Sequence, residues 1–288
     1  MSVFRAAAIQ MCSGVDPQRN ATDLAGYVAD AAGQGAVYVQ TPEMTGALQR
    51  NRKELASVLR GENDDIIVRT ASELAARHKI HLHIGSTAIA RDDGKIANRA
   101  FFFGPDGNIL ARYDKIHMFD VDLDNGESWR ESAVYAPGND TVVLDLPFAK
   151  VGLAICYDVR FPQLFRAQAL AGASVITAPA AFTRQTGEAH WHVLQRARAI
   201  ENGAFMISAA QAGIHEDGRE TFGHSIIVAP WGEILAEADH AEPVIIVADI
   251  DPDLSTAARA KVPNLKNARP FGVLVENAGQ SERLVAAS

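Results

Sequence analysis

The chain has 288 residues, of which 48% are hydrophobic and 22% are charged, an ordinary composition for a soluble globular protein. Its formal net charge of −8, with no cluster of basic residues, argues against nucleic acid as a partner. The sequence has no run of about 18 apolar residues that would span a membrane, and its first residues lack the features of a secretory signal. We therefore expect a cytoplasmic protein that binds neither a membrane nor a nucleic acid.

Strand and helix patterns alternate along the chain, which predicts an α/β protein. The apolar run over 4–9 predicts a buried strand. Asp16-Pro17 then supplies a helix N-cap and a first helical residue with a preset φ, and Gly33 and Gly35 predict the helix end. The elements expected next are a strand over 37–39, a helix that begins near 63–65 and buries Ile67, Ala71, Leu74 and His78, and strands over 81–89, 100–103 and 109–113.

The stretch from Asp114 to Asn139 shows no periodicity, and a loop of this length in a compact domain is usually functional. Regular patterns then continue, so we expect a single domain over 1–270. Residues 271–288 are expected to form a C-terminal tail that wraps a neighbour or the surface. The elements expected in the second part are strands over 141–146 and 150–155, a helix over 161–171, a strand over 174–178, a helix over 186–202, and strands over 205–209, 225–228, 234–236 and 244–248.

One internal repeat suggests how these elements are arranged. Residues 35–43 (Gly-Ala-Val-Tyr-Val-Gln-Thr-Pro-Glu) resemble residues 172–180 (Gly-Ala-Ser-Val-Ile-Thr-Ala-Pro-Ala), and each segment closes a β-α-β unit. We infer two similar halves whose sheets pack face to face with helices outside, and chance similarity of short apolar strands is the alternative. Glu43 then lies just past the C-terminal end of a strand, where open α/β sheets keep their sites. Its equivalent in the other half is Ala180.

The two cysteines, Cys12 and Cys156, are expected to be free thiols, because nothing in the sequence indicates export to an oxidising compartment. Cys156 closes an apolar strand and precedes Tyr157-Asp158, so its sulfur could enter a cleft, with the Tyr157 amide in an oxyanion hole. A small buried hydrophobe is the equal alternative on local context. Cys12 has no such context and is expected to be structural.

A thiol nucleophile needs a base and a group that stabilises the oxyanion. Three charged residues are candidates for these tasks: Glu43 after Pro42, and Lys115 and Glu131 in the long loop. Each of them, taken alone, could equally be an ordinary solvated charge. The residue types by themselves therefore leave the roles open.

Three segments, taken together, carry a resemblance that decides between these alternatives. Residues 41–43 (Thr-Pro-Glu), 113–117 (Tyr-Asp-Lys-Ile-His) and 155–162 (Ile-Cys-Tyr-Asp-Val-Arg-Phe-Pro) resemble, in order and spacing, the Glu-Lys-Cys motifs of the nitrilase superfamily of carbon–nitrogen hydrolases. The similarity extends to about Pro270. It continues through 186–191, 195–201, 223–225 and 230–233.

Within that superfamily the chain looks like the branch that contains ω-amidase and deaminated-glutathione amidase. That branch has Cys-Tyr-Asp after the strand, as at Cys156, whereas nitrilases typically carry Cys-Trp-Glu. Residues 209–213 and 223–225 resemble the deaminated-glutathione side more closely. Residues 262–265 depart from the more basic tail that this branch leads us to expect.

The resemblance implies a four-layer α-β-β-α sandwich and a homodimer or dimer-based tetramer. It implies Cys156 as nucleophile, Glu43 as general base and Lys115 as the cation that stabilises the oxyanion, with Glu131 as the second glutamate that supports the lysine. The implied reaction is hydrolysis of a linear carboxamide, deaminated glutathione or a related α-keto ω-amide, through a thioester. A nitrilase or an N-carbamoyl amino acid hydrolase is the rival enzyme. A catalytically inert binding protein on the same fold would lack one of the three catalytic residues.

Physical arguments add two expectations about this site. Burial is expected to raise the pKa of Glu43 toward neutrality, which would make it a competent base. An acidic substrate would need local positive charge in a protein of net charge −8. Arg184, expected on a loop before a helix that starts at Thr186, is the candidate for a bidentate carboxylate clamp. Phe119, Phe182 and Thr183 complete the expected substrate-binding set.

No cofactor and no metal are expected. The histidine pairs at 81 and 83 and at 190 and 192 lie two residues apart, which on a helix places them on different faces. The spacings typical of zinc sites, His-Glu-x-x-His and paired Cys-x-x-Cys, do not occur in the sequence.

Overall fold

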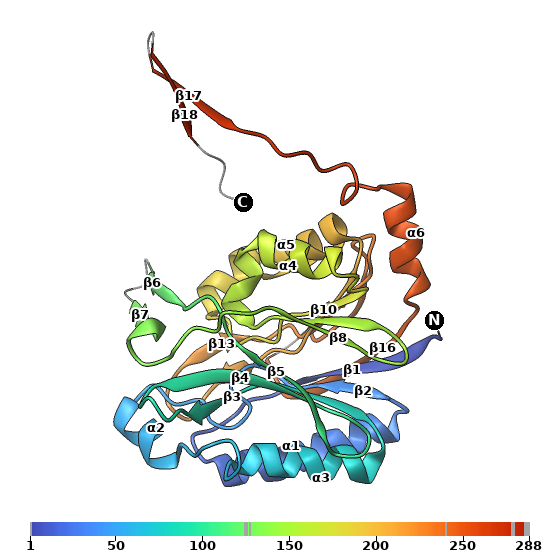
Figure 1. Cartoon of the computed structure of the whole chain (residues 1–288). Helices are drawn as coiled ribbons and strands as arrows, with labels where there is room; N and C mark the ends of the chain where they lie inside the picture. Colours follow the sequence, from blue (N-terminus) through green and yellow to red (C-terminus); the bar gives the residue numbers. More distant parts are fainter. Residues whose placement is uncertain (1, 124–125, 127, 240, 278–279, 285–288) are drawn as a thin grey trace.

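The computed structural model describes residues 2–123, 126, 128–239, 241–277 and 280–284. Two six-stranded sheets pack face to face, and helices cover their outer surfaces (Figure 1). Helices α1 (Pro17–Gly33) and α3 (Ile66–His78) cover one sheet, and α4 (Pro162–Leu170) and α5 (Arg184–Asn202) cover the other. The expected four-layer α-β-β-α sandwich is confirmed.

Each sheet has a parallel centre and antiparallel edges. The first sheet has the order β16-β1-β2-β3-β4-β5 (Val244–Ile250, Phe4–Gln10, Tyr38–Gln40, His81–Ala90, Ile96–Phe103 and Ile109–Asp114). The second has the order β15-β14-β11-β10-β9-β8 (Ile234–Glu237, Ile226–Val228, Phe205–Ser208, Val175–Thr177, Lys150–Leu153 and Val142–Asp145).

The two sheets repeat one topology. Strands β1, β2 and β3 run parallel, with antiparallel neighbours β16 on one side and β4 and β5 on the other. Strands β9, β10 and β11 run parallel in the same way, between β8 on one side and β14 and β15 on the other. The inference of two similar halves is therefore confirmed, because β2 and β10 occupy equivalent places and Glu43 and Ala180 each follow their strand by three residues.

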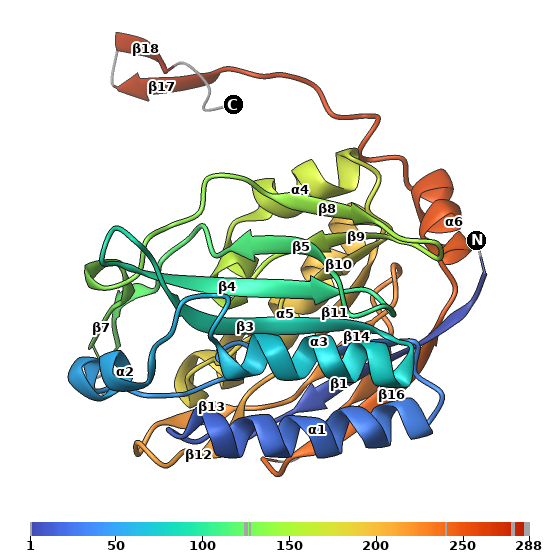
Figure 2. The same ribbon diagram turned by 60° about the horizontal axis from the view of Figure 1, so that its bottom comes forward.

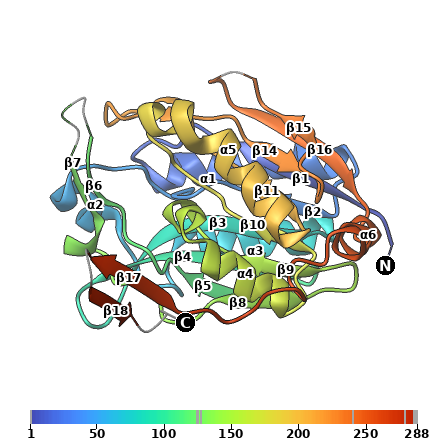
Figure 3. The same cartoon turned by 90° about the horizontal axis from the view of Figure 1, so that it is seen from above.

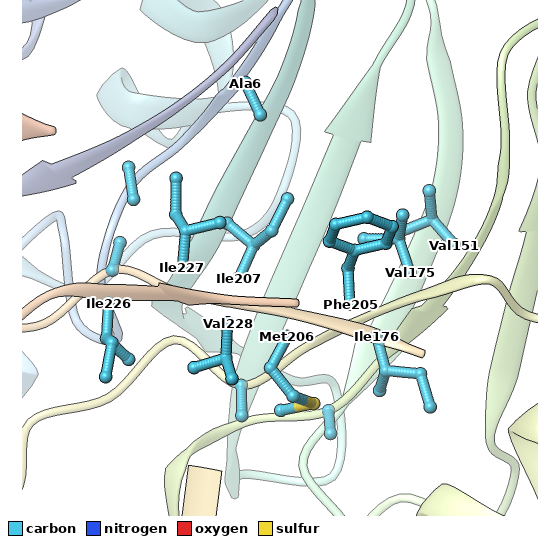
Figure 4. Packing of buried hydrophobic residues seen from close by; sticks show 14 of the residues in the cluster. Ala6, Val151, Val175, Ile176, Phe205, Met206, Ile207, Ile226, Ile227 and Val228 are labelled. Atoms are coloured by element: carbon cyan, nitrogen blue, oxygen red, sulfur yellow. The ribbon is translucent and has the colours of Figure 1, made fainter. Parts of the chain in front are cut away.

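The inner strands of the second sheet (β9, β10, β11 and β14) are buried on both faces, which explains their nearly continuous apolar sequences. Side chains alternate along each strand (Figure 4). Those that point toward the first sheet and its Ala6 are Ile227, Ile207, Phe205, Val175 and Val151. Those that point to the opposite face, which the helices cover, are Ile226, Val228, Met206 and Ile176.

Helix boundaries follow the local signals in the sequence. Asp16 caps α1, since its carboxylate accepts the Gln18 N–H at 2.9 Å, and Pro17 is the first helical residue. Asp65 caps α3 by accepting the N–H groups of Ile67 and Val68. The predicted apolar face of α3 is buried, except that His78 at the helix end is only half-buried.

Several short elements were not predicted, and the prediction that 114–139 lacks regular structure is wrong in part. Segments of three residues are too short to show a hydrophobic period, and seven-residue α2 buries a single side chain, Leu55. The unpredicted elements are α2 (Arg52–Val58), β6 and β7 (Asp120–Asp122 and Ser128–Arg130), the 3₁₀ turns η1 (Glu131–Ala133) and η2 (Cys156–Arg160), β12 and β13 (Ala212–Ile214 and Glu220–Phe222), α6 (Asp253–Lys261), and β17 and β18 (Val273–Asn277 and Gln280–Leu284).

The C-terminal segment leaves the sandwich after α6. The chain then extends outward, and the hairpin of β17 and β18 (Val273–Asn277 and Gln280–Leu284) stands clear of the sheets and helices (Figure 2). It does not wrap the surface of its own chain; contact with a neighbour stays a prediction, as does the domain boundary at residue 270. Residues 278, 279 and 285–288 of the expected tail lie outside the described residues.

The β6–β7 hairpin and α2 lie at one end of the sandwich, and α6 lies at the other (Figure 3). In the described part of the chain, no helix combines the length and the apolar character that a membrane span requires.

Candidate active site

The carboxylate of Glu43, three residues past the end of β2, accepts three hydrogen bonds from nitrogen atoms. Oε1 accepts from Lys115 Nζ at 3.0 Å and from Asn98 Nδ2 at 2.9 Å. Oε2 accepts from the backbone N–H of Ala181 at 2.9 Å, across the interface between the two halves. The next residue, Met44, has a φ of +57°, a conformation that concentrates at functional sites. The carboxylate therefore has a fixed direction.

Gly85 in β3 allows this arrangement to form. A Cβ atom at this position would come within 2.1 Å of the Thr41 carbonyl oxygen and 2.5 Å of Pro179. The segments after β2 and β10, which carry the repeat, therefore pass close together against the bare backbone of Gly85. Its N–H also donates to Thr41 Oγ1 at 3.1 Å.

Lys115 follows β5 and lies between two carboxylates. Its Nζ donates to Glu43 Oε1 and to both oxygens of Glu131, at 3.0 and 2.8 Å. Glu131 begins the turn η1, and its Oε2 also accepts the Phe119 N–H at 2.7 Å. Asn98 Nδ2 reaches Glu131 Oε1 at 3.2 Å as well as Glu43, so one amide links both carboxylates. Only 2% of the Lys115 side chain is exposed, which makes this a desolvated charge cluster.

Cys156 is the first residue of η2, three residues past the end of β9, and has a φ of +49°. Its N–H donates to the Pro179 carbonyl at 2.9 Å, and its buried thiol is hydrogen-bonded to the Glu43 carboxylate. The Tyr157 N–H follows in the first turn of a 3₁₀ segment, where amides have no acceptor within the helix. Both cysteines are free thiols, as predicted; Cys12 is exposed.

Asp158 connects the cysteine turn to the lysine segment. Its fully buried carboxylate accepts from Tyr113 Oη at 2.7 Å and from the Ile155 N–H at 2.9 Å. It also accepts the His117 N–H at 3.0 Å and lies 2.7 Å from His117 Nδ1. The residues on either side of Lys115 are therefore fixed to the residues on either side of Cys156.

The pKa of Glu43 differs from the value expected from the sequence. Burial raises the pKa of Glu43, but the charge of Lys115 and the hydrogen bonds from Cys156, Lys115 and Asn98 outweigh burial and lower it below the ordinary value. The expectation that the pKa of Glu43 lies near neutrality is therefore wrong, because the effect of burial is outweighed. Burial and the Glu43 carboxylate raise the pKa of the Cys156 thiol well above its ordinary value, against the effect of Lys115.

Burial opposes the charge of Lys115, but Glu131 and Glu43 raise its pKa well above the ordinary value. The resting cluster consequently contains an ionised carboxylate, a neutral thiol and an ammonium ion. A neutral thiol that donates to a carboxylate is arranged for proton transfer at the moment of attack.

These groups line a cavity of about 240 Å³. Phe119, Phe182 and Thr183, which were expected to bind substrate, also line it. The Tyr157 side chain is not among the lining groups; its ring packs edge-on against Phe119 and Phe161. Other lining residues are Met44, Ala47, Leu48, Gln49, Arg52, Leu55, Ser128, Trp129, Arg130, Val134, Tyr135, Ala181 and Arg219.

The structure does not bring Arg184 into this cavity. The expectation of a loop position is wrong, because α5 begins at Arg184 and Thr183 is its N-cap. Its guanidinium pairs with Glu188 at 2.9 Å and with Glu220, and 60% of the side chain is exposed. Both partners are carboxylates of the protein, so this arginine is already neutralised on the surface.

Four buried or half-buried residues of this region were not assigned a role from sequence: Asn98, Asp158, Gln211 and Arg219. Gln211 donates to the Glu43 carbonyl at 3.0 Å and to Ser13 Oγ at 2.8 Å. Asn98 gave one available signal, since it is a polar residue in strand β4, whose other residues are apolar except Arg99. Arg219 gave none, because its place depends on the unpredicted β12–β13 hairpin.

Among the described residues, one group could hold a metal ion: His192, His224 and Glu237. In this structure Glu237 Oε1 lies 2.6 Å from His192 Nε2 and 2.9 Å from His224 Nδ1. None of the three lines the cavity that contains Cys156.

Comparison with known proteins places this arrangement in a family. The model of the carbon–nitrogen hydrolase family matches residues 5–260, almost the whole described sandwich. The chain belongs to the carbon–nitrogen hydrolase family. The identification of a nitrilase-superfamily enzyme from three short motifs is thereby confirmed.

Its relatives include amidases of similar length. Human ω-amidase NIT2 is 36% identical over 271 residues, which cover 93% of this chain and 96% of that protein. The deaminated glutathione amidase of Synechocystis is 37% identical over 276 residues, which cover 93% and 98%. The prediction of an amidase that acts on carbon–nitrogen bonds is confirmed at this level.

Solved structures agree with this assignment. Saccharomyces cerevisiae Nit3, a member of branch 10 of the nitrilase superfamily, superposes with a TM-score of 0.82 at 29% identity, over 91% of this chain and 94% of that one. A glutamate-to-glutamine mutant of an amidase from Nesterenkonia, with acrylamide added at its active-site cysteine, gives a TM-score of 0.76 at 27% identity, over 90% and 98%.

Proposed function

We propose that this chain hydrolyses a carboxamide through a thioester on Cys156, with Glu43 as the general base and general acid. The observation that carries the proposal is the buried cluster of Cys156, Glu43, Lys115 and Glu131 in one cavity, with the thiol hydrogen-bonded to the Glu43 carboxylate. Glu43 follows the parallel strand β2 of the first half, and Cys156 follows the parallel strand β9 of the second half.

The first step forms the thioester. As sulfur attacks the amide carbon, the thiol proton moves to Glu43 and the carbonyl electron pair moves to oxygen. Glu43 then gives its proton to the nitrogen, the C–N bond breaks, and ammonia or an amine leaves. A carboxylate with a lowered pKa is ionised at neutral pH and ready to accept this proton.

The second step returns the enzyme to its resting state. Water attacks the thioester carbon while Glu43 takes one of its protons. The C–S bond breaks, the acid product leaves, and the sulfur takes the proton back from Glu43. One carboxylate thus acts twice as base and twice as acid.

Lys115 is proposed to stabilise the oxyanion together with the Tyr157 N–H, each such donor contributing roughly 3–4 kcal/mol in known cases. An ammonium has three donors, and in the resting cluster all three face carboxylate oxygens of Glu43 and Glu131. When Glu43 takes the thiol proton, its attraction for Lys115 falls as the oxyanion appears. Glu131, which accepts two hydrogen bonds from Lys115, holds the lysine in place during this exchange.

The substrate is proposed to be a small α-keto ω-amide, with deaminated glutathione ahead of short ω-amides. The names of the relatives and the Cys-Tyr-Asp sequence at Cys156 support this substrate class. The order within the class rests on residues 209–213 and 223–225, which resemble deaminated-glutathione amidase more closely. The test is ammonia or amine release from deaminated glutathione, α-ketoglutaramate, an aliphatic nitrile and an N-carbamoyl amino acid. Preference for either of the last two would overturn the substrate class, and no release from any of them would favour an inert binding protein.

A homodimer, or a tetramer built from it, in the cytoplasm is the proposed state of the protein. Large apolar side chains are exposed near the outer face of the second sheet, with Val193 and Ile200 of α5 exposed by 69% and 52% and Trp231 by 54%. Light scattering at micromolar concentration tests the assembly, and a monomer would contradict it.

A further inference from the structure

Arg219 is the one residue of the β12–β13 hairpin that lines the cavity with Cys156 and Glu43. It directly precedes β13, and its neighbour Glu220 points the other way, to Arg184 on the surface. The two arginines that contact this hairpin or belong to it therefore differ in their surroundings. Arg184 is neutralised outside, and Arg219 is directed inward.

The guanidinium of Arg219 has donors that the protein does not use. Its Nε is buried and has no hydrogen-bond partner among the described residues. Its nearest carboxylate, Asp217, is 3.7 Å away, longer than a hydrogen bond. Only 16% of the side chain is exposed, so water does not replace the missing acceptors freely. A buried arginine with an unused planar edge is arranged to receive two oxygens of a ligand.

The surroundings fix the direction of this edge. The guanidinium lies over the Trp129 ring, 4.5 Å from its centre, and the Arg50 guanidinium lies 4.9 Å from the same centre. The Asp217 carboxylate accepts the Arg219 backbone N–H at 2.9 Å, and the Arg219 carbonyl accepts the His215 N–H at 2.8 Å. The backbone of Arg219 is therefore held in place, while the side-chain Nε has no hydrogen-bond partner among the described residues.

Two further observations connect Arg219 to the reacting groups. Burial lowers the pKa of Arg219, and the charge of Arg50 lowers it further. The charges of Asp217 and Glu43 raise it. Arg219 and the proposed base Glu43 therefore interact within one low-dielectric cavity. The β13 strand is also joined to the cavity wall, because Thr221 pairs with Thr183 and the Phe222 N–H donates to the Phe182 carbonyl at 3.0 Å.

We propose that Arg219 is the receptor for a carboxylate on the acyl part of the substrate, with Trp129 as the platform that orients its guanidinium. The proposal rests on the proposed amide hydrolysis and narrows it to amides whose acyl part is acidic. It also assigns the cation that an acidic substrate needs to a residue inside the cavity, in place of Arg184. A carboxylate there would satisfy the unused Nε and a second N–H in a bidentate pair.

The kinetic experiment compares glutaramate, the monoamide of a five-carbon diacid, with its neutral methyl ester. The parent should prefer the acid in kcat/KM by about 10-fold or more, since charged bidentate pairs are among the stronger hydrogen bonds. Arg219→Gln should reduce this preference roughly 10- to 100-fold, mainly through KM for the acid. Arg219→Lys, which keeps the charge and loses the fork, should fall between them. The matched control is Arg184→Gln, which removes an arginine that two carboxylates already neutralise and should leave the preference within about twofold.

A binding experiment separates this proposal from amide hydrolysis itself. Calorimetry with glutarate on Cys156→Ala and on Cys156→Ala/Arg219→Gln needs no turnover. Weaker glutarate binding in the double variant supports the subsite even if no amide is cleaved. The proposal is overturned if the parent shows no preference for the acid, or if Arg219→Gln folds with the parent's thermal transition and keeps both the preference and the affinity for glutarate.

Discussion

The two halves of the sandwich share one topology but contribute different chemistry. Strand β1 pairs with β2 so that Ala6 faces Tyr38, and β9 pairs with β10 so that Val151 faces Val175. Since Tyr38 and Val175 are equivalent in the repeat, Cys156 is equivalent to Met11. Glu43 is likewise equivalent to Ala180.

The proposed nucleophile and base therefore come from different halves and from non-equivalent strands. At each equivalent position the other half has an inert residue, Met11 or Ala180, both buried. The second half still supports the base, because the Ala181 N–H donates to Glu43. The repeated topology thus brings two strand ends together, and each end contributes one reactive group, while Lys115 and Glu131 come from the segment after β5.

The largest expected effect concerns the nucleophile of the second half. Cys156→Ala should reduce kcat by at least about 10³-fold with the thermal transition retained, because the covalent step is lost. Steady-state ammonia release from the preferred amide measures this. Cys12→Ser, at an exposed thiol outside the cavity, is the control and should stay within about twofold. Residual activity of Cys156→Ala within tenfold of the parent would exclude the thiol mechanism.

The next effect concerns the charged groups of the first half. Glu43→Gln and Lys115→Ala should each lower kcat by about 10²- to 10⁴-fold, and the double variant should lose far less than the product of the two. The shared contact of 3.0 Å between Nζ and Oε1 is the physical reason for this coupling. The coupling is measured from the kcat values of the two single variants and the double variant at saturating substrate. Effects that multiply would show that the two groups act independently.

A smaller effect is expected at the connection between the halves. Asp158→Asn keeps the size of the side chain but replaces one acceptor oxygen by a donor against Tyr113, Ile155 or His117. We expect a loss of about 1–3 kcal/mol in the free energy of unfolding, together with a lower kcat. Urea unfolding measures the stability, and Asp249→Asn, at an exposed carboxylate, should change it much less. Equal losses in both variants would contradict the role given to Asp158.

The smallest expected effects concern the pH dependence of the reaction and of the Cys156 thiol. Because the pKa of Glu43 is lowered, the base stays ionised as pH falls, and kcat/KM should decline only below the ordinary carboxyl value of 4.5. Because the pKa of Cys156 is raised, the thiolate absorbance that distinguishes the parent from Cys156→Ala should appear only above 9.0. Thiolate absorbance near neutral pH would instead indicate a preformed ion pair with Lys115.

The sequence was sufficient for those parts of this account that depend on local signals. The repeat at 35–43 and 172–180 predicts the two halves because the same local sequence forms the same strand and strand end in each half. The three motifs predict Glu43, Lys115 and Cys156 as one cluster, and the structure brings them together. Glu131 joins them through two hydrogen bonds from Lys115.

The remaining features depend on contacts between distant segments. The pKa of Glu43 follows from Lys115, Asn98 and Cys156, none of which is near it in sequence, so burial alone gave the wrong direction. Arg184 and Arg219 look alike as isolated arginines. The β12–β13 hairpin, whose strands are too short to show a period, distinguishes them: it supplies Glu220 as a surface partner for Arg184 and places Arg219 in the cavity.

The most direct test of the central claim is intact-mass spectrometry of enzyme quenched during turnover of glutaramate or another cleaved amide. The thioester mechanism predicts a covalent adduct with the mass of the acyl group, located on Cys156 by peptide mapping and absent from Cys156→Ala. An adduct on another residue, or turnover by Cys156→Ala at the parent's rate, would contradict it.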